Sequence, residues 1–407
     1  MSIKIGYSEQ DDAFASGEQV IRNAMNSDIS DAPNLVLAFC TNSIDQQLFV
    51  DGLSSQLPPE TPIVGATTIG IINNDVISYN RPSAAALVLQ SKDIRTRITH
   101  AELKGGNEHQ AGADLATRAG RDKDDRFLFL LYNMIKKARS HRTLPEMNSL
   151  NSILHGIRST EPSPIPIFGG GSIGDYQFSP SRLFSRAGSS SSALLGITFG
   201  GSFYYDYTIM HGCTPVDGEY HTITKNDGAL ILEIDDKPAI EVINDLYGSR
   251  DWQRDLPVKE LAIGMNLGEK YGSYQESQYV TRLIAGPHLL RKGILTPEPD
   301  WHIGTEIQLM IRDTEAMITS TKQNSKMLLE KTLAAGKKPL LGLYIDCAGR
   351  TCYFSNSLQE EAAMVQGVFN SHHVPLFGFY SGFEIAPLFG KSRGLEWTGV
   401  LILLAEA

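Results

Sequence analysis

The sequence predicts an α/β protein of two closely packed domains, built from layered, mostly buried mixed sheets. Three observations lead to this fold class. The chain has 407 residues, 42% hydrophobic and 20% charged, an ordinary globular composition with room for two domains. Short continuous apolar runs, typical of strands buried on both faces, are spread along it. These runs recur in one order, as a unit of strand, helix, strand and strand that is present three times.

Each copy of the unit opens with an apolar strand and continues into a helix. The three strands are Leu35–Phe39, Phe127–Tyr132 and Pro339–Tyr344. The predicted helices are Asp45–Gln56, Leu144–Arg158 and Gln359–Asn370. The second and third have apolar residues along one side, and the first is less regular.

A motif of proline, two apolar residues and glycine begins the second half of each copy. The three segments are Pro62–Gly70, Pro166–Gly174 and Pro375–Glu384. The proline motif is predicted to be a strand. Because tight turns need backbone freedom, we interpret the further glycines, as in Gly170–Gly174, as marking a repeated turn. Each copy closes with a further strand, over Ala84–Leu89, Ala193–Phe199 and Thr398–Leu404.

The region between the second and third copies has a different character. Residues 222–313 are mainly strand-like, with a helix predicted over Pro238–Tyr247, and a long helix over Glu315–Ala335 follows. We place the domain boundary so that residues 1–220 form one domain and 221–407 the other. No low-complexity linker marks it, so the two domains are expected to pack closely.

Charge and cysteine usage limit the class of partner. The formal net charge of -10 argues against a nucleic-acid surface, which needs clustered Lys and Arg. The first residues, Met1–Ser8, lack a long apolar signal core, and no run approaches the roughly 20 residues of a membrane helix. Four cysteines without a spaced framework suit a reducing compartment. We expect a cytoplasmic protein, with neither nucleic acid nor membrane as a partner.

Three motifs carry a resemblance to a known family. Val64–Gly70 resembles the Gly-x-Ser/Thr-Thr-x-Gly signature of the FIST N-terminal domain. Phe377–Ser381 with Glu384 resembles the end of the FIST C-terminal domain, and segments within Thr224–Ala239 resemble the link between the halves. The first copy reads Gly70-Ile71, without the carboxylate that the family often has there, whereas Glu384 is present in the last copy.

The resemblance implies a non-catalytic sensor of signal transduction that binds a small ligand. The two-domain layout is similar to that of the nitric-oxide-sensing (NosP) branch. That branch binds haem and regulates a partner histidine kinase or a cyclic-di-GMP enzyme, a diguanylate cyclase or phosphodiesterase. The implied cofactor is haem b and the implied signal is nitric oxide; a homodimer is compatible with this arrangement.

His211 is the candidate ligand to the haem iron. If residues 204–213 form a strand, Tyr205, Tyr207, His211 and Cys213 share one face, because side chains alternate along a strand. A neutral imidazole is a good axial ligand, and aromatic neighbours suit a porphyrin. A hydrogen-bonded histidine at the end of a strand explains the residue equally well.

The alternative is a haem-free sensor of an amino acid or another small metabolite. Its ligand would bind at the signature loops, through Thr67, Thr68, Ser172, Ser381 and Glu384.

Three other chemistries are weaker. His211 and Cys213 could begin a zinc site, but no paired cluster of ligands accompanies them. Gly170–Gly174 matches the Gly-x-Ser-x-Gly nucleophile elbow, but the residues that follow do not start a helix as that motif requires. His288 and His302, the next haem candidates, are expected in loops.

Overall fold

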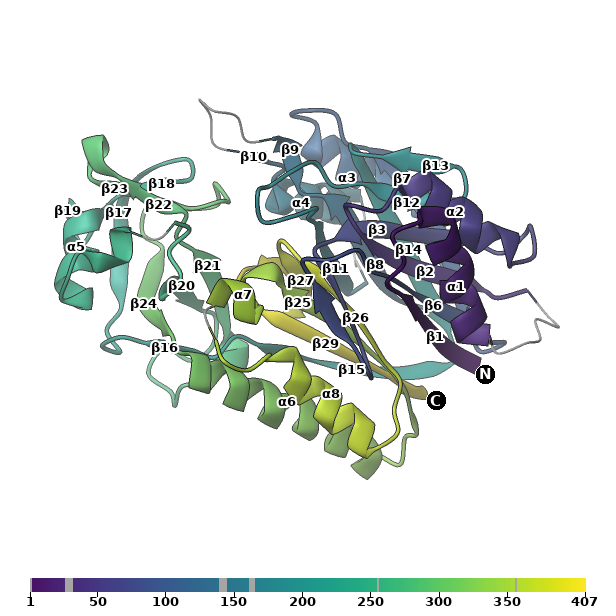
Figure 1. The fold of residues 1–407 in the computed structure, drawn as a ribbon. Coiled ribbons are helices and arrows are strands. Elements are labelled where there is room, and N and C mark those ends of the chain that lie inside the picture. Colours follow the sequence, from purple (N-terminus) through teal and green to yellow (C-terminus); the bar gives the residue numbers. More distant parts are fainter. Residues whose placement is uncertain (1, 26–31, 139–144, 161–164, 255, 356) are drawn as a thin grey trace.

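The computed structural model describes residues 2–25, 32–138, 145–160, 165–254, 256–355 and 357–407. Its centre is formed by three units with the same strand order (Figure 1). In each unit the edge strand pairs antiparallel with the last strand, and the last strand pairs antiparallel with a middle strand. The middle strand pairs parallel with the remaining strand. Two helices pack together beside each sheet.

The elements of the three units follow one another along the chain. The first contains β1 (Ser2–Ser8), α1 (Ala13–Met25), β2 (Leu35–Thr41), α2 (Gln46–Ser55), β3 (Ile63–Thr68) and β6 (Ala84–Gln90). The second contains β7 (Ile94–Glu102), α3 (Glu108–Ala119), β8 (Asp125–Asn133), α4 (Leu150–Thr160), β11 (Ile167–Ser172) and β14 (Ala193–Gly201). The third contains β15 (Phe203–Met210), α6 (Thr314–Ala334), β25 (Pro339–Cys347), α8 (Ala362–Ser371), β26 (Leu376–Ser381) and β29 (Gly399–Glu406).

Each unit also contributes a β-hairpin to the sheet of another unit, which gives every one of these sheets six strands. The first unit's hairpin, β4 (Gly70–Asn73) and β5 (Ile77–Tyr79), pairs with β26 in the third. The second unit's hairpin, β12 (Leu183–Ser185) and β13 (Gly188–Ser190), pairs with β3 in the first. The third unit's hairpin, β27 (Glu384–Leu388) and β28 (Lys391–Leu395), pairs with β11 in the second. The exchange therefore closes a ring of three units.

The inner faces of the three sheets pack against one another and form a shared core. Phe39 of β2 stacks on Phe379 of β26, with ring centroids 4.1 Å apart. Phe129 of β8 meets Phe379 edge-on at 6.4 Å. Burying each such ring contributes roughly 1.5–3 kcal/mol, so this core is a main source of stability.

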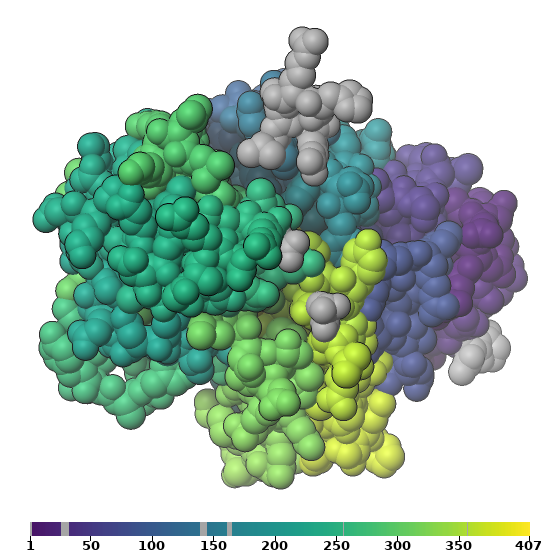
Figure 2. All heavy atoms as spheres, turned by 60° about the vertical axis from the view of Figure 1, so that its left-hand side comes forward, coloured from purple at the N-terminus to yellow at the C-terminus, as the bar shows by residue number. Residues whose placement is uncertain are grey.

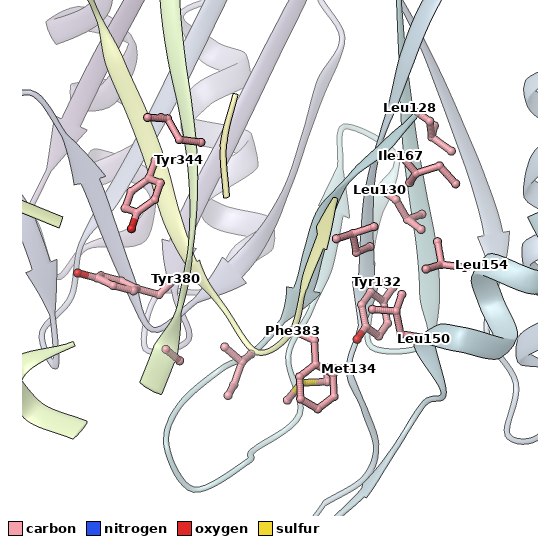
Figure 3. Close-up of a cluster of buried hydrophobic side chains, with 14 of the residues drawn as sticks. Leu128, Leu130, Tyr132, Met134, Leu150, Leu154, Ile167, Tyr344, Tyr380 and Phe383 are labelled. Carbon is pink, nitrogen blue, oxygen red and sulfur yellow. The ribbon is translucent and has the colours of Figure 1, made fainter. Parts of the chain in front are cut away.

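The outer faces of the sheets carry the helices. In the second unit, Leu128, Leu130 and Tyr132 of β8 lie near Leu150 and Leu154 of α4 (Figure 3). One set of alternate residues thus faces the shared core and the other faces helices. This explains why the strands are apolar without interruption in the sequence.

An inserted lobe interrupts the third unit between β15 and α6. Residues 213–312 form a nine-stranded sheet and the helix α5 (Ala239–Tyr247), with a core that includes Trp252 and Trp301. The lobe, teal to green, projects from the three units in Figures 1 and 2. Its strands are β16 (Cys213–Pro215), β17 (His221–Asp227), β18 (Leu230–Ile234), β19 (Lys237–Pro238), β20 (Leu261–Asn266), β21 (Tyr279–Leu283), β22 (Gly286–His288), β23 (Gly293–Leu295) and β24 (Glu306–Arg312).

The α/β fold class with mixed sheets is confirmed, as is the recurring unit. The helix predicted over Leu144–Arg158 begins late, at Leu150, because β10 (Glu146–Met147) precedes it and pairs with β9 (Ile135–Lys137). Residue 144 lies outside the described residues. The boundary between residues 1–220 and 221–407 falls inside the lobe, between β16 and β17, and stays a prediction. No helix in the described part of the chain is long and apolar enough to span a membrane.

The glycine of the recurring proline motif lies inside the predicted strand, and the turn interpretation is wrong for Gly170 and Gly171, which also lie within β11. Gly65, Gly169 and Gly378 occupy the same place in β3, β11 and β26. A Cβ at these positions would come within 1.8, 1.9 and 2.5 Å, respectively, of a carbonyl oxygen on the neighbouring parallel strand. The three glycines therefore allow a close approach of strand backbones.

Glycines also set the packing of two helix pairs. Gly17 and Gly52 lie between α1 and α2, and Gly112 and Gly156 lie between α3 and α4. A Cβ on these four would lie 2.3, 2.1, 2.1 and 1.9 Å from a backbone oxygen of the partner helix. Gly367 of α8 has no such neighbour among the described residues within 4 Å.

We expect Gly156→Ala to destabilise the protein by about 1–3 kcal/mol, because the added methyl group forces α3 and α4 apart. Gly367→Ala is the matched control and should be neutral or stabilising by up to about 1 kcal/mol, since alanine has the higher helix propensity. Thermal unfolding followed by circular dichroism measures both changes. Equal melting temperatures for Gly156→Ala and the parent protein would contradict the packing described.

Candidate ligand site between the lobe and the third unit

A hollow of about 370 Å³ lies where the inserted lobe meets the third unit. One wall comes from the lobe and the other from the start of α6 and the short helix α7 (Cys352–Ser355). The lining residues are His211, Lys259, Glu260, Arg312, Asp313, Thr314, Met317, Tyr353 and Ser355.

Arg312, the last residue of β24, places a guanidinium group at this hollow. The group donates to the carbonyl oxygen of Lys259 and, at 3.4 Å, to that of Gly349. Its carbon lies 3.6 Å from the centre of the Trp397 ring. Burial lowers the pKa of Arg312 to about 10, and no carboxylate of the described residues forms an ion pair with it. A guanidinium in this setting has donors suited to a carboxylate or another anion.

Three further charged side chains line the same hollow. Lys259 has no carboxylate partner among the described residues, and its ammonium group lies 4.9 Å from an aromatic ring centre. Glu260 accepts a hydrogen bond of 2.9 Å from the Tyr247 hydroxyl. Asp313 caps the N-terminus of α6. Two cations and two carboxylates around a small hollow suit a zwitterion, with its carboxylate at Arg312 and its ammonium group at Glu260.

One carboxylate of the lobe, Glu276, ties it to the third unit. It accepts hydrogen bonds from the backbone N–H groups of His211 and Gly212, just after β15. It also accepts from Ser320 and, at 3.2 Å, from Asn324, both on α6. The lobe therefore has a fixed polar contact with both elements that flank its insertion point.

A second carboxylate ties the lobe to the second unit. Glu298 accepts from the N–H of Leu150 at 2.8 Å and from the Ser149 hydroxyl at 3.0 Å, and so caps the N-terminus of α4. Burial raises the pKa of Glu298 to about 7. The neighbouring Asp300 pairs with the buried Arg282 at 2.9 Å. The lobe thus bridges two units.

The strand predicted over residues 204–213 is shorter than expected. β15 ends at Met210, and Gly212 turns the chain with a φ of +67°. Tyr205 and Tyr207 share a face as predicted, but His211 leaves it at this turn. The prediction that His211 and the tyrosines line one pocket is therefore wrong in its geometry.

The two tyrosines lie against the shared core of the three sheets. The ring of Tyr205 is 5.1 Å from that of Phe127, and the ring of Tyr207 is 4.9 Å from that of Phe168. The Tyr207 hydroxyl donates to the carbonyl oxygen of Pro387 at 3.0 Å. These contacts give both residues a packing role.

His211 is buried, and both of its ring nitrogens are engaged. Nδ1 accepts the backbone N–H of Cys213 at 3.0 Å, so Nε2 carries the proton and donates to the carbonyl oxygen of Glu276 at 3.0 Å. Burial lowers the pKa of His211, which keeps the ring neutral. A haem iron needs a free nitrogen lone pair. In this conformation the residues do not fit haem.

A zinc site at His211 and Cys213 is not supported either, because no cluster of possible metal ligands among the described residues includes them. Among the described residues, the group that could hold a metal ion is Asp122, Asp124 and Asp125, and it does not include His211 or Cys213. Cys213 is a buried free thiol.

The hydroxyls proposed for the haem-free site meet at the ends of β3, β11 and β26, where they join the units. Thr68 donates to a backbone carbonyl of β26 at 2.7 Å, and Ser172 donates to that of Thr67 at 2.8 Å. Ser381 donates to Glu384 at 2.6 Å. Burial raises the pKa of Glu384 to about 8. Each hydroxyl is already bonded within the protein, and these residues are not among those that line the charged hollow.

The contacts of the remaining candidates, Ser172, His288 and His302, indicate structural roles. Ser172 is buried, and the residues after β11 form a loop rather than the helix of a nucleophile elbow. His288 is the last residue of β22, so its predicted place in a loop is wrong, and it accepts a backbone N–H at 3.3 Å. His302 lies in a loop of the lobe and is exposed.

The chain is therefore a layered α/β protein with a small charged hollow beside an inserted lobe. The model of the FIST N domain matches residues 34–237, and that of the FIST C domain matches residues 239–387. The chain therefore belongs to the FIST family, whose domains are sensory domains of signal-transduction proteins.

The other comparisons add little. No curated protein matches the chain. A chorismatase structure is 9% identical with a TM-score of 0.35, and each chain covers all of the other. The Thermotoga maritima PurL complex with FGAR is 12% identical with a TM-score of 0.22, over all of this chain and 72% of that one. At these scores neither likeness bears on fold or function.

We expect the stability of the protein to fall as the pH falls below about 6.5, in part through His211. The unfolded chain binds a proton on this residue there, whereas the native chain, with the lowered pKa, does not. The difference amounts to about 1.4 kcal/mol per pH unit for one proton. Melting temperatures from pH 7.5 to 5 should fall more steeply for the parent protein than for His211→Gln. Parallel curves would show that His211 has no such role.

Proposed function

We propose that this FIST protein is a haem-free sensor of a small zwitterionic metabolite such as an amino acid, bound in the hollow between the lobe and the third unit. The observation that supports this most is the guanidinium of Arg312. It lines the hollow and has no carboxylate partner among the described residues. Arg312 is partly buried and has no carboxylate counter-ion among the described residues, so a ligand carboxylate at this position would gain a charge-assisted hydrogen bond.

The rest of the hollow supplies the other half of the recognition. Glu260 lines the hollow beside Arg312 and has one hydrogen bond from Tyr247, which leaves acceptor capacity for an ammonium group. Lys259 adds a second positive charge for the ligand carboxylate. The volume of about 370 Å³ suits a small metabolite.

Binding there would act on the position of the lobe. A ligand would touch Arg312 of the lobe and Met317 of α6 at once, because both line the hollow. If the ligand makes stronger contacts when the lobe is in one position than in another, binding would shift the protein towards the first position. The partner that reads this change is a signalling enzyme, a histidine kinase or a cyclic-di-GMP enzyme, as the family resemblance implies.

Isothermal titration with the twenty proteinogenic L-amino acids tests the proposal. We expect at least one of them to bind the parent protein. Arg312→Met should weaken that binding by about 10–150-fold, since a hydrogen bond to a charged group contributes about 1.5–3 kcal/mol. Lys326→Met, which removes an exposed cation of α6 paired with Glu330, is the matched control and should bind as the parent does. Binding by none of the twenty, or equal binding by Arg312→Met, would refute the site.

A second variant tests the zwitterion. Glu260→Gln should weaken binding of the amino acid but leave the affinity of its deaminated carboxylic acid analogue unchanged, because only the former carries an ammonium group. A parallel loss for both compounds would mean that Glu260 does not bind that group.

The haem-based nitric oxide sensor is the competing hypothesis, and a visible spectrum distinguishes it. It requires His211 to leave both of its present partners, the N–H of Cys213 and the carbonyl of Glu276. We therefore expect protein produced with ample haem to show no Soret band that depends on His211. A Soret band that His211→Ala abolishes would restore the haem hypothesis.

A further inference from the structure

The ring of three units has three equivalent edge strands, β1, β7 and β15, and each ends its own sheet. Two of them are protected against further pairing. The lobe lies against β15, where Glu276 binds the backbone just beyond the strand. β7 carries charged residues along its length, including Arg95, Arg97 and Glu102, a common protection for an edge.

The third edge strand, β1, lacks both kinds of protection. Its side chains Ile3, Ile5 and Tyr7 form one row on the side of the shared core, and all three are only half-buried. Its one charged residue is Lys4, whose ammonium group donates back to the carbonyl of Met25 in α1 at 3.4 Å. An edge with a single charged residue and an apolar row invites another strand.

A hollow of about 720 Å³ lies directly beside this row. Its other walls are the turn between β4 and β5 and the end of α8 with the loop that follows. The lining residues are Ile3, Ile5, Tyr7, Asn23, Asn73, Asn74, Asp75, Val76, Asn370, His373, Val374 and Pro375. There is space here for the side chains of a strand added at β1.

Backbone groups of β1 also point outward at this edge, although the Tyr7 carbonyl is already bonded and would accept from an added strand only through its second lone pair. The carbonyl of Tyr7 accepts from the side chain of Asn23 at 2.8 Å, so it points away from β6. In an antiparallel strand the N–H and C=O groups of one residue point to one side, and the side alternates along the strand. The groups of Ile3 and Ile5 therefore also point outward, and no described residue bonds to them there.

We propose that a second copy of this chain occupies this edge, its own β1 pairing antiparallel with the first about a two-fold axis at Ile5. The strand is complementary to itself in this register. Ile3 lies opposite Tyr7 of the partner copy, Ile5 opposite itself, and Lys4 opposite Gly6, so the two lysines do not face each other. Aromatic and β-branched residues are favourable cross-strand neighbours.

Pairing would join two six-stranded sheets into one sheet of twelve strands. The row of Ile3, Ile5 and Tyr7 from the second copy would lie on the same side as the first row and enter the hollow beside it. An isologous two-fold contact of this kind is the commonest route to a homodimer. Since the contact is one short strand and its row of side chains, the dimer dissociates on dilution.

Light scattering coupled to size exclusion tests the proposal with the full chain. We expect a mass that rises with concentration from 44.6 kDa towards twice that value. Ile5→Lys should stay monomeric, because two lysines would then face each other at the axis. It should also melt at a lower temperature than the parent protein, because Ile5 packs against the shared core. Lys4→Gln, on the opposite face of the same strand, is the control and should still form the dimer.

Oxidative cross-linking locates the axis independently of those variants. Ile5→Cys should form a disulfide-linked dimer under mild oxidation, and Lys4→Cys should not, since only residue 5 meets itself across the axis. A monomer at every concentration up to about 200 µM would overturn the proposal, because even a weak strand contact is populated there. A dimer that persists in Ile5→Lys would equally overturn it.

Discussion

The exchange of hairpins between the three units is the constraint on which the rest of the structure depends. No unit completes its own sheet: β4–β5, β12–β13 and β27–β28 each pair with a strand of another unit. The exchange holds the inner faces of the sheets together, so the apolar rows around Phe39, Phe129 and Phe379 form one core rather than three. The buried hydroxyls of Thr68 and Ser172 bind across the same joints.

The repeat was predictable from sequence, but the strand pairings that connect its three copies were not. Apolar runs and the recurring glycine at Gly65, Gly169 and Gly378 predicted three copies, because each copy needs the same close approach of parallel strands. The hairpins are short, and their partners lie in other units, as Gly378 opposite Ile72 illustrates. Local patterns of side chains hold no information on such long-range pairing.

The same distinction applies to the candidate site. The alternation of Tyr205 and Tyr207 was readable from their spacing, but Glu276, which fixes the backbone at His211, belongs to the lobe, 65 residues further along the chain. The sequence did not point to Arg312 as a site residue, because an arginine at the end of a strand is common. What distinguishes Arg312 is that it lines a hollow and forms no ion pair with a carboxylate of the described residues. Sites built at the contact of a core and an insertion come from tertiary structure, not from motifs.

The pairing of β4–β5 with β26 has a consequence for biosynthesis. About 300 residues separate these segments, and at roughly 5–20 residues per second a ribosome needs on the order of 15–60 seconds to make that length. During that interval the hairpin β4–β5 has no strand to pair with, although the second unit can already contact the first. The ring of three units therefore closes only late in synthesis, and an unpaired hairpin exposed until then is the kind of segment from which aggregation starts.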